Sequence, residues 1–227
     1  MEPRAAILQK VTYADLQEVV SRDGLMLLGG FHPDSTEHMP DWCKTLVLIG
    51  PEADFWARFQ SSPEWRDGAQ DAMDRWSTRV LSAIAAEYHA EAMFPFGGAP
   101  FKPFFSWALR SGQAWQSPVN LLVHAGAGLM VSYRGALALR ERIDLPPAAQ
   151  NPCTPCAQPC RTACKTRALT PKGYDVPACK TYVASPEGLE NKSLGCTVRR
   201  TCPVSQSYAR MTEQSAYHMR TFLGESR

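Results

Sequence analysis

The feature that most constrains this chain is the crowding of cysteines into its last third. Four cysteines occupy the twelve positions from 153 to 164, in the stretch NPCTPCAQPCRTACK, and three more follow at 179, 196 and 202. The N-terminus lacks the pattern of a secretory signal, and no apolar stretch is long enough to span a membrane, so we expect a cytoplasmic protein without a membrane partner. In a reducing compartment, clustered cysteines more often bind metal or carry out redox work than form disulfides.

Charge and proline content divide the chain near residue 150. Residues 145–152 contain three prolines and are typical of a linker. Residues 1–150 carry 13 basic and 17 acidic side chains, whereas residues 151–227 carry 11 and 5, which makes the second part positive. A positive balance suits thiolates and an anionic cluster, but it also suits an acidic partner or nucleic acid. We predict two domains, residues 1–147 and residues 148–227.

The helical patterns lie mainly in the first part. Helices are predicted at residues 14–21, 67–89 and 103–112. The second of these is the longest and carries an apolar stripe at spacings of 3, 4, 4 and 4, formed by Met73, Trp76, Val80, Ile84 and Tyr88.

Short apolar runs between these helices predict strands. LMLLGGF (25–31) and TLVLIG (45–50) are bounded by Gly and Pro and indicate buried strands. Residues 119–124 and 128–139 flank the sequence AGAG and predict an antiparallel pair. The mixture of helices and strands predicts an α+β layered fold.

Two stretches resemble known families. APFKPFFSWALRSGQAWQSPVNLLVHAGAGLMVSYRGALAL (99–139) resembles the central stretch of epoxyqueuosine reductases, in which the cysteine block also follows shortly afterwards. GGFHPDSTEHMPDWCKTLVLIGP (29–51) is similar to a strand–loop–strand motif of the cblC-type cobalamin-processing family. The resemblance covers roughly residues 10–205. It implies a nitroreductase-like (cblC-type) mixed sheet flanked by helices, which holds a corrinoid such as cobalamin, followed by a small ferredoxin-like cysteine-rich subdomain.

The resemblance also implies a set of cofactor-binding residues. They would lie around the corrin face, where glycines let the main chain approach a flat ligand closely: Trp115, Asn120, His124, Gly126 and Gly128. Two simpler interpretations stay open. The glycines can belong to a hairpin that binds nothing, and His124 can be hydrogen-bonded within the fold.

The sequence departs from the reductase pattern at two positions. Gly97-Gly98 precede the Ala-Pro where the family has its catalytic Asp, and Pro118 stands at the place of its Lys. Without a proton donor, epoxide opening loses its acid. The helical-repeat domain that helps many members to bind tRNA has no counterpart in this sequence. We therefore expect neither epoxyqueuosine reduction nor a tRNA partner, and no catalytic residue is assigned.

The cysteine spacing is close to that of ferredoxins. Bacterial two-cluster ferredoxins use C-x2-C-x2-C-x3-C-P, and the fourth cysteine of each motif ligates the other cluster. Here the first block is C-x2-C-x3-C-x3-C. The resemblance implies one complete [4Fe–4S] ligand set, Cys153, Cys156, Cys160 and Cys202. It leaves a second set one thiolate short, Cys164, Cys179 and Cys196, with Arg199 where the missing cysteine belongs.

Three interpretations of the cysteines remain at this stage: at least one [4Fe–4S] cluster, a ferredoxin-like shape that has lost its clusters, or a zinc site. The function favoured is an iron–sulfur redox protein that passes electrons to a corrinoid or other flat ligand in the N-terminal pocket, with an electron-donor protein as a second partner. The alternatives are a non-catalytic corrinoid carrier and an interaction module that metal merely staples.

Overall fold

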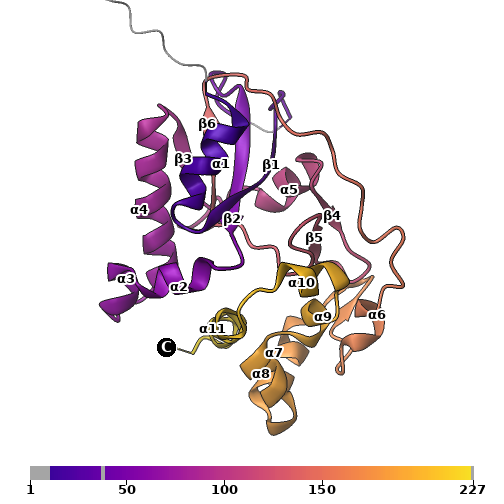
Figure 1. The fold of residues 1–227 in the computed structure, drawn as a ribbon. Coiled ribbons are helices and arrows are strands. Elements are labelled where there is room, and N and C mark those ends of the chain that lie inside the picture. Colours follow the sequence, from indigo (N-terminus) through magenta and orange to yellow (C-terminus); the bar gives the residue numbers. More distant parts are fainter. Residues whose placement is uncertain (1–10, 37–38, 226–227) are drawn as a thin grey trace, which may run out of the picture.

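The computed structural model describes residues 11–36 and 39–225, and its centre is a four-stranded antiparallel sheet. The strands lie in the order β1-β2-β6-β3 and span Leu25–Phe31 (β1), Thr45–Pro51 (β2), Gly135–Leu139 (β6) and Glu91–Met93 (β3). Every neighbouring pair is antiparallel. The expected α+β class is confirmed, and Figure 1 shows the sheet with helices packed against it.

The strand sequences explain why both faces of this sheet are covered. All seven residues of β2 are buried, as its continuous apolar run predicts. Val47 and Ile49 point into one hydrophobic cluster, and Leu46 and Leu48 point into another. This alternation follows from the two-residue period of a strand.

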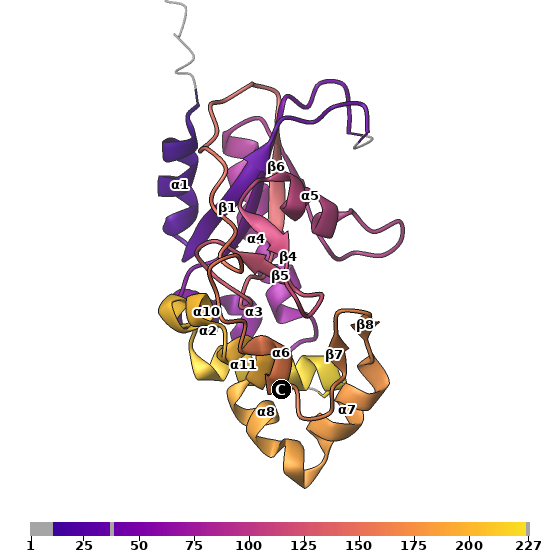
Figure 2. The ribbon, with the colours of Figure 1, turned by 90° about the vertical axis from the view of Figure 1, so that its right-hand side faces the viewer.

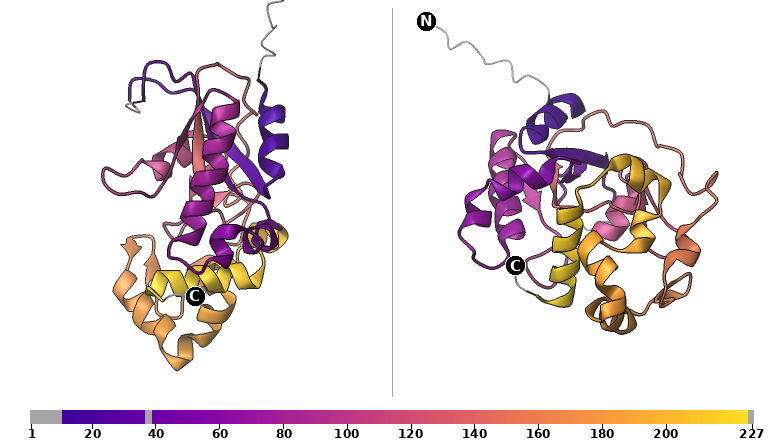
Figure 3. Two further views of the ribbon diagram at one scale, coloured as in Figure 1. Left: turned by 90° about the vertical axis from the view of Figure 1, so that its left-hand side faces the viewer. Right: turned by 60° about the horizontal axis from the view of Figure 1, so that its bottom comes forward.

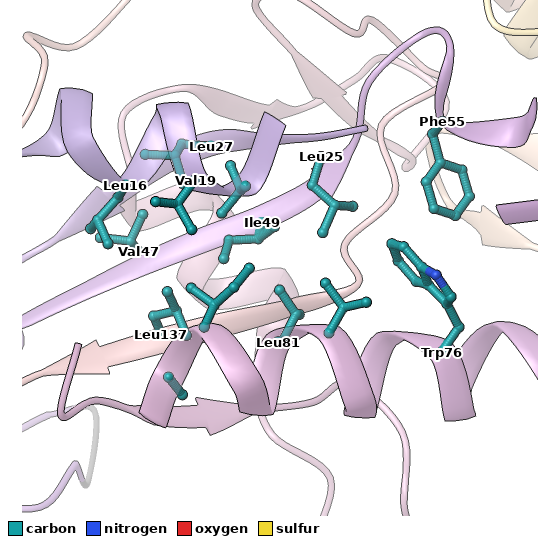
Figure 4. Packing of buried hydrophobic residues seen from close by; sticks show 14 of the residues in the cluster. Leu16, Val19, Leu25, Leu27, Val47, Ile49, Phe55, Trp76, Leu81 and Leu137 are labelled. Atoms are coloured by element: carbon teal, nitrogen blue, oxygen red, sulfur yellow. The ribbon is translucent and has the colours of Figure 1, made fainter. Parts of the chain in front are cut away.

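Different helices cover the two faces. The first face packs against α1 (Tyr13–Ser21) and α4 (Ala72–Glu87), whose side chains meet those of the strands in Figure 4. The second face packs against α5 (Phe104–Arg110) and lies near a two-stranded ribbon of β4 (Ala114–Gln116) and β5 (Leu122–His124). Helix α1 begins with a capping box, in which Thr12 and Asp15 satisfy each other's backbone N–H groups.

The long helix predicted at residues 67–89 is confirmed in its centre, but it starts later. Gly68 and Asp71 both have positive φ, so the chain cannot be helical through them, and α4 begins at Ala72. Short helices α2 (Phe55–Gln60) and α3 (Pro63–Arg66) precede it. Of the predicted stripe, four residues are buried and Tyr88 is partly buried.

The predicted antiparallel pair between residues 119–124 and 128–139 is wrong. Strand β5 pairs with β4, and β6 pairs with β2 and β3 in the central sheet. Within the described chain, a single bridge between His124 and Gly128 is the only strand pairing between the two segments. The apolar residues of 135–139 are buried completely as a central strand, which a two-stranded ribbon could not achieve.

The cysteine-rich part is a set of short helices below the sheet. It comprises α6 (Cys160–Ala163), β7 (Leu169–Thr170), β8 (Gly173–Tyr174), α7 (Val176–Ala184), a 3₁₀ turn at Pro186–Gly188, α8 (Leu189–Leu194), α9 (Thr197–Arg200), α10 (Pro203–Tyr208) and α11 (Thr212–Leu223). Residues 142–151, at the predicted linker, have no regular secondary structure and run down one side of the molecule (Figure 1).

Helix α11 joins the two parts. It lies between the sheet part and helices α7 and α8, as Figures 2 and 3 show. Its Tyr217 ring packs against Trp56, Phe59 and Trp65, at centroid distances of 5.2 to 6.4 Å. In residues 11–36 and 39–225, no helix has both the length and the apolar character that a membrane crossing requires.

Candidate metal centre

Four cysteines line a single cavity of about 210 Å³. They are the complete ligand set expected from the sequence: Cys153, Cys156, Cys160 and Cys202. Two come from the loop that leads into α6, the third is the first residue of α6, and the fourth comes just before α10, about forty positions later. The fold thus brings together thiols that are far apart in the chain.

Local hydrogen bonds shape the loop that carries the first two thiols. The Asn151 side chain accepts a hydrogen bond from the Cys153 backbone N–H at 2.9 Å. Gln158 adopts a positive φ, and its backbone N–H donates to the Cys156 sulfur at 3.2 Å. This bond fixes the position of the Cys156 sulfur within the loop. Pro203 follows Cys202 and occupies the first turn of α10, where its missing N–H costs nothing.

The four thiols are close enough to affect one another electrostatically. Burial raises the pKa of Cys153, and the other three thiols raise it further. Burial also raises the pKa of Cys160, as do the thiols of Cys202 and Cys156. Ligand cysteines must lose their protons, and a cationic centre between them would reverse these shifts. Without such a centre, the mutual effect of the thiols and their burial favours the protonated forms of Cys153 and Cys160.

An apolar shell of buried side chains adjoins this cavity, and Val123 and Leu129 of the shell line its wall. Val119, Val123 and Leu129 from the sheet part pack together with Leu169 and Val198 from the cysteine-rich part. Such a shell excludes water and lowers the local dielectric, which tunes a bound cluster. The cavity lies at the boundary between the two predicted domains.

The zinc alternative requires donors that converge on one point, with Zn–S distances of about 2.3 Å. Among the described residues, no three His, Cys, Asp or Glu side chains lie close enough together to share one metal ion. A cubane does not need this convergence, because each of its thiolates binds a different iron.

The three cysteines of the second expected set, Cys164, Cys179 and Cys196, also lie near one another, but the set has only three thiols. Burial raises the pKa of Cys179, and the nearby Cys196 and Cys164 thiols contribute in the same direction. At Cys164, burial acts to raise the pKa, but hydrogen bonds from the Thr166 side chain and from backbone amides outweigh it and lower the pKa.

A second cavity, of about 250 Å³, contains Arg199, which the resemblance places at the position of a fourth ligand. Cys179 and Cys196 line it, and so does Arg199. The Arg199 side chain donates a hydrogen bond to the Leu129 carbonyl. Sequence reasoning missed three further residues of this cavity, Tyr174, Arg210 and His218, because they have no motif spacing that would reveal them.

The five residues expected around a corrin ring do not share a cavity. Of the five, only Asn120 lines an open hollow of about 410 Å³. Its side-chain amide donates a hydrogen bond to the Thr170 carbonyl at 2.7 Å. Trp115 packs on the apolar shell of the cysteine cavity.

His124 is the last residue of β5, and its side chain contacts the turn that follows. Its Nδ1 accepts hydrogen bonds from the backbone N–H groups of Gly126 and Ala127, at 3.0 and 3.2 Å. Burial lowers its pKa to about 4, so the ring is neutral near pH 7. These bonds occupy Nδ1. His124 is thus hydrogen-bonded within the fold, which is the simpler interpretation of this residue.

Gly128 permits a close approach of main chain, although to another part of the protein. Its φ is +56°, and a Cβ atom built on it would lie 2.5 Å from the Ser205 backbone nitrogen. Gly128 therefore allows α10, which follows Cys202 directly, to dock on the sheet part. Gly126 has no positive φ, and a Cβ atom there would meet the His124 ring at an ordinary 3.8 Å.

We expect Gly128→Ala to destabilise the fold by about 1–3 kcal/mol, from the left-handed backbone alone, and by more where the clash with Ser205 cannot relax. Urea unfolding measures this change. Gly126→Ala is the matched control and should stay within about 0.5 kcal/mol of the parent. Equal stability of the two variants would show that α10 does not dock at Gly128.

No family model, curated protein or solved structure matches this chain significantly.

Proposed function

We propose that this chain is an iron–sulfur electron-transfer protein with one [4Fe–4S] cluster. Cys153, Cys156, Cys160 and Cys202 would hold the cluster. The observation that carries the proposal is that these four thiols, from two distant segments, line one cavity with apolar walls. Four thiolates are the ligand number that such a cluster takes.

The residues around the cavity have separate roles. The four thiolates would bind the cluster, and the Gln158 backbone N–H would orient Cys156 through its hydrogen bond to the sulfur. Val123 and Leu129 exclude water from the inner wall. When bound, a cluster of this type supplies one-electron transfer.

The molecule that exchanges electrons with the cluster would dock beside Cys153. An open hollow there shares Ser117, Cys153 and Gln158 with the cysteine cavity, so a small molecule or protein side chain in it would lie close to the bound centre. The residues expected around a corrin ring do not fit that group, because only Asn120 lines this hollow. The proposed function therefore includes no step at cobalamin.

The proposal extends to the fold. A nitroreductase-like (cblC-type) sheet part followed by a ferredoxin-like part is supported by the antiparallel sheet with helices on both faces and by the cysteine spacing. This fold would place the cluster against the sheet part, where the apolar shell joins the two.

The first test is the spectrum of protein purified without oxygen. We expect a brown protein with broad absorbance at about 400 nm, as for [4Fe–4S] proteins. Reduction with dithionite should bleach this band and produce the electron paramagnetic resonance signal of a reduced cubane. A colourless protein that contains no iron would instead support an interaction module, in which the cysteines have no redox role.

A further inference from the structure

The second cavity brings two arginines together. Arg199 and Arg210 line it beside His218, and no Asp or Glu of the described residues does. The cavity lies where α9 and α11 meet the residues that follow Leu129, at the boundary between the sheet part and the cysteine-rich part.

Neither guanidinium has a carboxylate partner. In the described part of the chain, the ion pairs include neither Arg199 nor Arg210. Arg199 donates to the Leu129 carbonyl, and Arg210 donates to the Met130 carbonyl at 3.2 Å and to the Ser215 hydroxyl at 3.1 Å. A guanidinium has five N–H donors, so both arginines retain donors for a ligand.

His218 adds a polar atom that lacks a partner. His218 lines this cavity, and its Nε2 is buried and receives no hydrogen bond from the described residues. Buried polar atoms are nearly always hydrogen-bonded, so an orphaned nitrogen calls for an explanation. A ligand between His218 and the two arginines would satisfy it.

The electrostatics indicate what that ligand should be. Burial lowers the pKa of Arg210 to about 10, with a further contribution from Arg199. Burial also lowers the pKa of His218 well below its usual range, and both arginines act in the same direction. Buried charges of one sign are costly unless an opposite charge compensates them. Two guanidiniums that line one cavity without a carboxylate partner among the described residues therefore favour an anion as the ligand.

Arg199 makes a second iron–sulfur cluster an unsuitable occupant of this cavity. Arg199 occupies the sequence position of the absent cysteine, and a guanidinium has no lone pair that could bind iron. Two arginine forks match the geometry of carboxylate and phosphate oxygens instead. Leu121, Val131 and Phe222 provide an apolar wall for the remainder of a small molecule.

We propose that this cavity is a binding site for a small oxyanion, a carboxylate or phosphate group, held by Arg199, Arg210 and His218. The size of the cavity, about 250 Å³, suits a small ligand. The site is separate from the cysteine cavity and does not depend on a cluster being bound there.

Isothermal titration calorimetry on the full chain, purified without oxygen, tests this site with three probes: inorganic phosphate, propionate and the uncharged propionamide. We expect phosphate or propionate to bind and propionamide not to bind. Phosphate alone would identify a phosphate group as the ligand chemistry, and propionate alone would identify a carboxylate on an apolar body.

Variants then locate the binding. Arg210→Gln and Arg199→Gln should each weaken it by about 10- to 100-fold, since each removes charge-assisted hydrogen bonds. Arg199→Lys retains the charge but loses the fork, and it should also weaken binding while leaving the unfolding midpoint unchanged. The matched control is Arg200→Gln, on the same helix, because Arg200 pairs with Glu190 and does not line the cavity.

Three results would overturn the site: no binding of either anion, equal weakening by Arg200→Gln, or an iron content of about eight per chain, which would mean a second cubane. An iron content of about four leaves the cavity free for an anion. A protein without iron would disprove the proposed function alone, since the calorimetry would still decide on the oxyanion site.

Discussion

Replacing Cys202 with alanine is expected to abolish the absorbance at about 400 nm and to lower the iron content at least about tenfold. Loss of partners outside the ligand set already costs about 10- to 100-fold in metal affinity, and the loss of a ligand should cost more. Cys202 is the informative choice because it lies far in sequence from the other three thiols that line the cavity. Iron analysis and absorption spectra of protein purified without oxygen measure the effect.

Cys43→Ala is the matched control for this result. Cys43 is buried beside the central sheet, and its thiol donates to the Thr45 carbonyl at 3.6 Å. Burial raises its pKa to about 11, which keeps it protonated and unsuited to bind metal. The control should retain the full absorbance. A Cys202→Ala protein as brown as the Cys43→Ala protein would remove Cys202 from the ligand set.

Phe59→Ala is expected to destabilise the fold by about 3–5 kcal/mol, the usual cost of removing a buried aromatic ring. Phe59 is fully buried and packs against Phe55, Trp65 and Trp76. It also contacts Tyr217 of α11, so its removal should loosen the helix that joins the two parts. For a chain of this length, the melting temperature should fall by about 6–20 °C.

Phe101→Ala is the control for this core variant. Phe101 is 66% exposed, so its removal should change the stability by less than about 0.5 kcal/mol. Differential scanning calorimetry compares the two directly. If Phe59→Ala melted within one or two degrees of the parent, α11 would not be anchored by this aromatic cluster.

Local sequence patterns predicted the helices and strands whose burial can be recognised within a single continuous segment. The run at β2 is apolar throughout because the strand is covered on both faces, and the stripe on α4 follows the helical period. Cys153, Cys156, Cys160 and Cys202 line one cavity, as the resemblance to ferredoxin-like ligand sets implies, and their role as ligands stays a prediction.

The elements that depend on long-range contacts could not be predicted in this way. The apolar runs at 119–124 and 135–139 both fit a strand. The sequence therefore did not reveal that β6 pairs with β2 while β5 pairs with β4. Gly128 was expected at a flat ligand, but the close approach that it allows is to Ser205. Arg210 and His218 reach the second cavity only because α11 folds back beneath the sheet part.

The most direct test of the central claim is the anomalous diffraction of iron in a crystal grown without oxygen. We predict one compact group of iron peaks in the cavity between α6 and α10, with Cys153, Cys156, Cys160 and Cys202 each bound to a different iron. Iron absent from that cavity, or bound only by Cys164, Cys179 and Cys196, would contradict the account.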